Sequence, residues 1–152
     1  MCDINDMKIE IINKEETIIP ENLKEIINII KNISEEVFQE LGTGFSEYIY
    51  HRALEISLRI NNINYDSKKM IPINYKGYNV GYGEADLIVY RNDQIVIIEL
   101  KAITNPPREI EIAQVKTYLK NLDNSDIGII INFPQPGTKI AKDNIDFKII
   151  NK

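Results

Sequence analysis

Ile95-Val96-Ile97-Ile98-Glu99-Leu100-Lys101 is the most informative segment of the chain, because two charges stand inside an aliphatic run. The run itself is typical of a buried strand. Strand side chains alternate, so Glu99 and Lys101 project from the same face, the one shared with Ile95 and Ile97. An unpaired carboxylate on a buried face costs several kcal/mol and takes up a proton or a cation. Glu99 therefore needs a partner.

Asp86 is the nearest candidate for a shared site. It stands at the head of the preceding strand-like segment, and the turn Arg91-Asn92-Asp93-Gln94 joins that segment to the next as an antiparallel hairpin. The start of one strand then lies beside the end of the other, so we expect Asp86 near Glu99 and Lys101. Two neighbouring carboxylates repel unless a divalent cation lies between them, and oxygen ligands suit Mg²⁺ or Mn²⁺. The alternative is a structural ion pair between Glu99 and Lys101 or another cation.

Helices and further strands are expected around this hairpin. Apolar spacing predicts a helix from Pro20-Glu21-Asn22 to Gly42 and a second from about Ser46 to Arg59. We expect the second helix to bury Tyr48, Ile49, Ala53, Ile56 and Ile60. Strands are expected at 69–75, 80–83, 85–90, 95–102 and 127–133, a helix from about 106 to 122, an edge strand at 146–150, and a strand or arm at 7–19. The order helix, helix, three-strand meander, helix, strand indicates a layered α/β domain.

Composition excludes several classes of protein. The chain has 152 residues, 43% hydrophobic and 27% charged, which fits one globular domain over 1–152. A single cysteine and a single histidine exclude a disulfide framework, a cysteine-based zinc site and a multi-histidine metal centre. The net charge of −5 argues against a passive coat for nucleic acid, although not against an enzyme whose carboxylates hold a metal ion. No apolar run reaches the roughly 20 residues of a membrane span and no secretory signal is visible, so we expect an intracellular protein.

The pattern Asp86 … Glu99-Leu100-Lys101 resembles the signature of the PD-(D/E)XK nuclease superfamily. Gly44-Phe45-Ser46-Glu47-Tyr48-Ile49-Tyr50 resembles Gly-x-x-Glu-x-x-Tyr, the motif of the GxxExxY family within it. Further similar segments follow in that family's order: Leu41-Gly42-Thr43-Gly44-Phe45, Tyr75-Lys76-Gly77, Ala85-Asp86-Leu87, Ile98-Glu99-Leu100-Lys101-Ala102, Ala113-Gln114 and Ile131-Asn132-Phe133. The resemblance covers about residues 25–135. It implies a restriction-endonuclease-like core of helix, three-strand antiparallel meander, helix and strand, here with an extra N-terminal helix.

The resemblance also implies a function, a metal-dependent nuclease that hydrolyses phosphodiester bonds of DNA or RNA with Mg²⁺ or Mn²⁺. Asp86 and Glu99 would hold the metal ion, and the Leu100 carbonyl and Glu47, directly or through water, would add ligands. Lys101 would orient or help to deprotonate the attacking water.

Gln114 and Tyr118 resemble the Gln-x-x-x-Tyr element of the RecB-like branch, where the pair supports the site and the nucleic acid. Their spacing of four places them on one helix face, so an ordinary polar–aromatic helix pair is the alternative. Two positions depart from the family pattern: Glu84 stands where an Arg is frequent, and Glu111 where a His recurs. These acids motivate a second hypothesis, a catalytically silent nuclease-fold module that binds nucleic acid or a protein partner. A third is a structural homodimer built on the isoleucine-rich first helix.

Overall fold

The computed structural model describes residues 17–104, 108–137 and 144–152, so most of the segment expected as a strand or arm at 7–19 lies outside it. The helices of the described chain are a short 3₁₀ turn η2 (Glu21–Leu23), α1 (Lys24–Leu41), α2 (Glu47–Ile60) and α3 (Glu109–Asn121). Its strands are β1 (Tyr65–Tyr75), β2 (Tyr78–Arg91), β3 (Gln94–Lys101), β4 (Ser125–Asn132) and β5 (Asp146–Asn151). None of these helices is long and apolar enough to cross a membrane.

The described strands form one sheet in the order β1-β2-β3-β4-β5. The pairs β1/β2 and β2/β3 are antiparallel, β3/β4 is parallel with α3 in the crossover, and β4/β5 is antiparallel. This topology confirms the restriction-endonuclease-like core of helix, meander, helix and strand, with α1 as the extra N-terminal helix. Two boundaries differ from the expectation: β1 begins at Tyr65 instead of residue 69, and β2 runs without a break through the two predicted segments.

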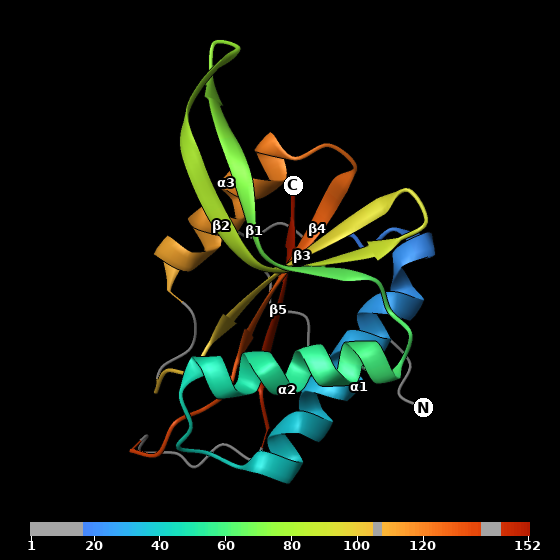
Figure 1. Ribbon diagram of the computed structural model, residues 1–152, viewed down its shortest axis with the longest axis vertical. Coiled ribbons are helices and arrows are strands. Elements are labelled where there is room, and N and C mark those ends of the chain that lie inside the picture. The colour runs from blue at the N-terminus through green and yellow to red at the C-terminus, as the bar shows by residue number, and fades with distance from the viewer. Residues whose placement is uncertain (1–16, 105–107, 138–143) are drawn as a thin grey trace.

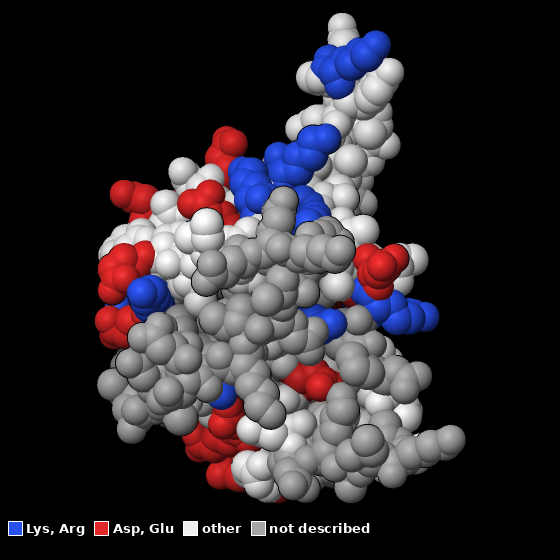
Figure 2. Space-filling view, turned by 180° about the vertical axis from the view of Figure 1, so that it is seen from behind, with Lys and Arg blue, Asp and Glu red and all other residues white. Residues whose placement is uncertain are grey.

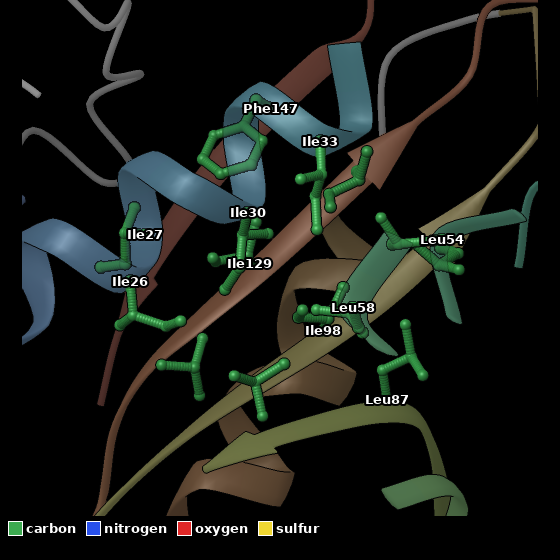
Figure 3. Packing of buried hydrophobic residues seen from close by; sticks show 14 of the residues in the cluster. Ile26, Ile27, Ile30, Ile33, Leu54, Leu58, Leu87, Ile98, Ile129 and Phe147 are labelled. Carbon is green, nitrogen blue, oxygen red and sulfur yellow. The ribbon is translucent and has the colours of Figure 1, made fainter. Parts of the chain in front are cut away.

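Helices cover both faces of the sheet (Figure 1). On one face, aliphatic side chains of α1 and α2 pack against β2, β3 and β4, as Figure 3 shows for Ile26, Ile30, Ile33, Leu54, Leu58, Leu87, Ile98 and Ile129. On the other face, Val115 and Leu119 of α3 pack against Ile88, Ile97 and Ile130. Each fully buried aliphatic side chain contributes about 1.5–3 kcal/mol, so both layers hold the sheet in place.

The expected buried face of α2 is wrong. Tyr48, Ile49, Ile56 and Ile60 are 40–73% exposed and Ala53 is only partly buried, whereas Tyr50, His51, Leu54 and Leu58 are buried. The contacts of Tyr50 determine which face of α2 is buried. Its ring stacks on Phe133 at 4.4 Å with an interplanar angle of 2°, and its hydroxyl donates to the Gly42 carbonyl at 2.6 Å. The stacking and hydrogen bond of Tyr50 therefore favour burial of its face of α2 over the face that carries Ile49, Ile56 and Ile60.

A long hairpin projects from the body of the sheet (Figure 1). We call residues 69–83 of β1 and β2 the β1–β2 arm. Its strands pair from Lys69↔Ala85 to Tyr75↔Tyr78, with a register shift after Ile73. The arm packs along α3 through Ile71 and Ile73, and nearer its tip the Asn74 amide donates to Asn121 Oδ1 at 3.0 Å.

Candidate active site

The candidate site lies where β2 and β3 diverge. The two strands pair from Arg91↔Gln94 to Leu87↔Ile98, and Asp86 follows immediately beyond the last pair. Asp86 Oδ2 accepts a hydrogen bond from the Leu100 amide at 2.8 Å, while the Asp86 amide donates to Glu99 Oε1 at 3.2 Å. Both acidic residues are buried, with exposed fractions of 6% and 4%. The structure thus brings together the two carboxylates that the hairpin predicts as neighbours.

Burial and mutual repulsion disfavour the charged forms of these groups. Burial first, and then the negative charge of Asp86, raise the pKa of Glu99 to about 8. The same two causes raise the pKa of Glu47, partly offset by the charges of Lys101 and Lys68. Without a cation, Glu99 therefore carries a proton at neutral pH. A divalent cation relieves such repulsion, and carboxylate oxygens suit Mg²⁺ or Mn²⁺, so the donors present fit the metal that the sequence resemblance implies.

Glu47 lies within electrostatic reach of Asp86, and Lys101 lies within electrostatic reach of Glu99 and Glu47. Glu47 begins α2, and the charges of Asp86 and Lys101 both affect its pKa. In the described ranges, however, no three Asp, Glu, His or Cys side chains converge closely enough to hold a metal ion. Asp86 and Glu99 are adjacent, but Glu47 is not close enough to complete a set of three ligands with them. The Leu100 amide is bonded to Asp86, and metal ligation by its carbonyl stays a prediction.

Lys68 is the site residue that the sequence reasoning missed. It stands opposite Asp86 in the β1–β2 register, with φ at 53°, and its Nζ lies 2.8 Å from Asp86 Oδ1 and 3.9 Å from Glu84 Oε1. Burial lowers the pKa of Lys68, but the hydrogen bond and charge of Asp86 outweigh it and raise the pKa overall. The alternative drawn from the sequence was an ion pair of Glu99 with Lys101 or another cation. The ion pair that the described chain has here joins Asp86 to Lys68 instead. The expected strand began at residue 69 and left Lys68 out, whereas β1 begins at Tyr65 and therefore includes it.

Gln114 and Tyr118 brace β2 just before Asp86. The Tyr118 hydroxyl accepts from Gln114 Nε2 at 2.7 Å and donates to the Glu84 carbonyl at 3.2 Å. The ring passes so close to β2 that a Cβ at Gly83 would lie 2.3 Å from Tyr118 Cε1, so this position requires glycine. The placement fits a pair that supports the site, and its contact with nucleic acid stays a prediction.

Comparison with known proteins agrees with this geometry. The family whose model matches residues 24–143 is described as the PD-(D/E)XK nuclease superfamily. The chain belongs to the PD-(D/E)XK nuclease superfamily. No match was found among curated proteins. Among solved structures, the chain is similar to one titled "Crystal structure of SSO0001", with 24% identity and a TM-score of 0.49. The match covers 69% of this chain and 49%, about half, of that one.

The two acids that depart from the family pattern have different surroundings in this superfamily member. Glu84 is half-exposed beside the site, within ion-pair distance of Lys68. Glu111 instead accepts a hydrogen bond from the Arg108 amide at 2.9 Å and pairs with its guanidinium at 2.7 Å, which lowers the pKa of Glu111. Its carboxylate therefore stabilises the start of α3.

His51 is a core residue of this superfamily domain. Its Nε2 lies 2.8 Å from Ser67 Oγ, and burial lowers its pKa, so the ring is neutral at pH 7. A surface hollow of about 370 Å³, lined in part by Glu25, Asn62 and Arg91, lies at the turn end of the β2–β3 hairpin. Asp86 and Glu99 stand at the other end of that hairpin, so the hollow is separate from the candidate site.

Proposed function

We propose that the protein is a metal-dependent nuclease of the GxxExxY type that hydrolyses phosphodiester bonds of DNA or RNA inside the cell. The observation that carries the proposal is the juxtaposition of Asp86 and Glu99 at the divergence of β2 and β3, with the pKa of Glu99 raised to about 8. Two adjacent buried carboxylates, one with a strongly raised pKa, are characteristic of a functional site.

The residues of the Gly-x-x-Glu-x-x-Tyr motif support this assignment in two ways. Tyr50 ties the start of α2 to Gly42 through its 2.6 Å hydrogen bond and to Phe133 through ring stacking. Glu47 lies one helical turn earlier, so these contacts orient Glu47 toward the acidic pair. Within the motif, Tyr50 thus has a structural role, and Glu47 is the acidic residue near the site.

Each residue has a distinct role in the proposed reaction. Asp86 and Glu99 would hold Mg²⁺ or Mn²⁺, the Leu100 carbonyl would be a further ligand, and Glu47 would act through water. When bound, such an ion supplies the Lewis acidity that lowers the pKa of the attacking water and neutralises charge on the phosphate. Lys101 orients that water. Gln114 and Tyr118 keep β2 in place.

A cleavage assay tests the proposal. Purified protein is incubated with labelled single- and double-stranded DNA and RNA in Mn²⁺, beside Asp86→Asn and the control Asp93→Asn in the exposed turn of the same hairpin. We expect Asp86→Asn to lose at least 100-fold in rate and Asp93→Asn to match the wild type. Equal cleavage by Asp86→Asn would reject the assignment. Mn²⁺ binding without cleavage of any substrate would favour the silent module.

A further inference from the structure

The β1–β2 arm presents large side chains that neither the core nor the proposed active site uses. Its exposed apolar and aromatic residues, each 54–77% exposed, are Met70, Tyr75, Tyr78, Val80 and Tyr82. They account for much of the large exposed apolar surface of the described chain, and they lie on one projecting hairpin (Figure 1). An exposed cluster of this kind marks a contact surface.

The arm is also basic in an otherwise acidic chain. Residues 69–83 contain Lys69 and Lys76 and no Asp or Glu, whereas the whole chain has a net charge of −5. Lys69 is paired with Asp66 at 3.1 Å, so Lys76 is the cation that the tip presents. Lys76 occupies the turn at the tip, with its Nζ 5.3 Å from the centre of the Tyr75 ring. Figure 2 shows basic side chains at the end of the projecting hairpin. The tip thus offers a cation and aromatic faces side by side.

The base of the arm is held rigidly. Ile71 and Ile73 pack with Val115 and Leu119 of α3, and the Tyr118 ring lies against Gly83. A surface that is already ordered loses little conformational entropy when it binds a partner. The arm is therefore suited to bind without first folding onto its ligand.

The alternation of β2 directs Tyr82 to the same side as Asp86. Gly83 faces Tyr118 and Ala85 lies in the core beneath α3, so Tyr82 and Asp86 project from the opposite face. Tyr82 pairs across the hairpin with Pro72 and is 64% exposed. Four residues of strand span about 13 Å, which is the distance along β2 from Tyr82 to the acidic pair.

We propose that the β1–β2 arm binds unpaired bases of the nucleic acid cleaved at the acidic pair, so that the substrate carries a single-stranded segment. Bases stack on Tyr82 and Tyr78, and Lys76 contacts the backbone phosphates. Aromatic rings beside the Lys76 ammonium, with no carboxylate within residues 69–83, match a polyanion whose base faces are accessible, and a closed duplex hides those faces. This inference rests on the proposed nuclease function and deepens it by naming the substrate class.

Binding of a fluorescent oligonucleotide, measured by anisotropy without divalent metal, tests the arm apart from cleavage. We expect Tyr78→Ala and Tyr82→Ala each to weaken binding of a single strand about tenfold, in the range of one base–aromatic stack. Lys76→Gln is expected to lower the slope of log affinity against log salt by about 0.7. The control Ile60→Ala removes an equally exposed apolar side chain from α2 and is expected to bind as the wild type does.

The outcomes separate this inference from the proposed function. Wild-type affinity in both tyrosine variants would overturn the inference and leave the arm as a surface for a protein partner, even if the wild type cleaves nucleic acid. Equal affinity for a blunt duplex and a single strand would overturn it as well. Binding that depends on the arm, without cleavage in Mn²⁺, would support the inference while the nuclease proposal fails. A wild type that binds no oligonucleotide overturns both.

Discussion

Replacement of Glu99 by Gln is expected to stabilise the fold at neutral pH. In the folded protein, burial and then the charge of Asp86 raise the pKa of Glu99 to about 8 from 4.5. A carboxyl whose pKa is raised by folding contributes its full stability below about pH 4.5 and loses it as the pH rises through about 8. Gln keeps the shape of the side chain and can still accept the 3.2 Å hydrogen bond from the Asp86 amide, while it never ionises.

The magnitude follows from the linkage between protonation and folding. At pH 7 the unfolded chain has an ionised Glu99, and the folded chain has a protonated one, so folding must take up a proton. Each pH unit above 4.5 then costs ~1.4 kcal/mol, which gives about 3 kcal/mol at pH 7 and less than about 1 kcal/mol at pH 5. The free energy of unfolding of Glu99→Gln should exceed that of the wild type by these amounts.

Urea unfolding followed by circular dichroism at pH 5, 6, 7 and 8, without divalent metal, measures the difference. Glu36→Gln, on the exposed side of α1, is the control and should differ from the wild type by the same small amount at every pH. A difference between Glu99→Gln and the wild type that stays constant from pH 5 to pH 7 would refute the reasoning. A variant less stable than the wild type at pH 7 would refute it too.

Three further perturbations test the site and its support. Binding of Mn²⁺ at pH 7 should release close to one proton per ion, because Glu99 must ionise; calorimetry in buffers of different ionisation enthalpy measures this, and Glu99→Gln should release none. Lys68→Met removes the ammonium 2.8 Å from Asp86 Oδ1 and should tighten Mn²⁺ binding about tenfold in the same calorimeter, whereas an unchanged affinity would contradict competition between that ammonium and the metal. Tyr50→Phe leaves the Gly42 carbonyl without its 2.6 Å partner and should lower the free energy of unfolding in urea by about 1–3 kcal/mol; wild-type stability would show that the bond contributes nothing.

The sequence predicted the β2–β3 hairpin and the acidic pair because both depend on local patterns. A short hairpin joins Asp86 to Glu99, and alternation and turn residues determine which ends of its strands meet. The order of helix, meander, helix and strand followed in the same way from the periodicity of the apolar residues and from the turn residues between them. The roles of these residues in catalysis stay predictions, because a pattern places side chains and does not measure a reaction.

The expectations that failed depended on contacts between distant segments. The buried residues Tyr50, Leu54 and Leu58 have helical spacing too, so spacing alone offers two faces of α2. Packing of Tyr50 on Phe133, a residue 83 positions later, selects between them. Lys68 was missed because its φ of 53° interrupts the strand pattern at the position where it faces Asp86. A left-handed residue inside a strand costs about 1 kcal/mol or more, so such positions often mark functional sites.

Continuity of β2 links the candidate site to the arm. Only Leu87 to Arg91 of this strand pair with β3; the preceding residues pair with β1 alone, and Asp86 stands at the transition. The divergence that brings Asp86 beside Glu99 therefore also releases the hairpin that carries Tyr82. Tyr118 packs on Gly83 between these two positions and donates to the Glu84 carbonyl, so it anchors this part of β2 to α3. Stacking on tyrosine is tolerant of base identity, so the proposed function of the site and the proposed role of the arm together predict cleavage whose position depends on the distance of the phosphate from the arm and not on base sequence.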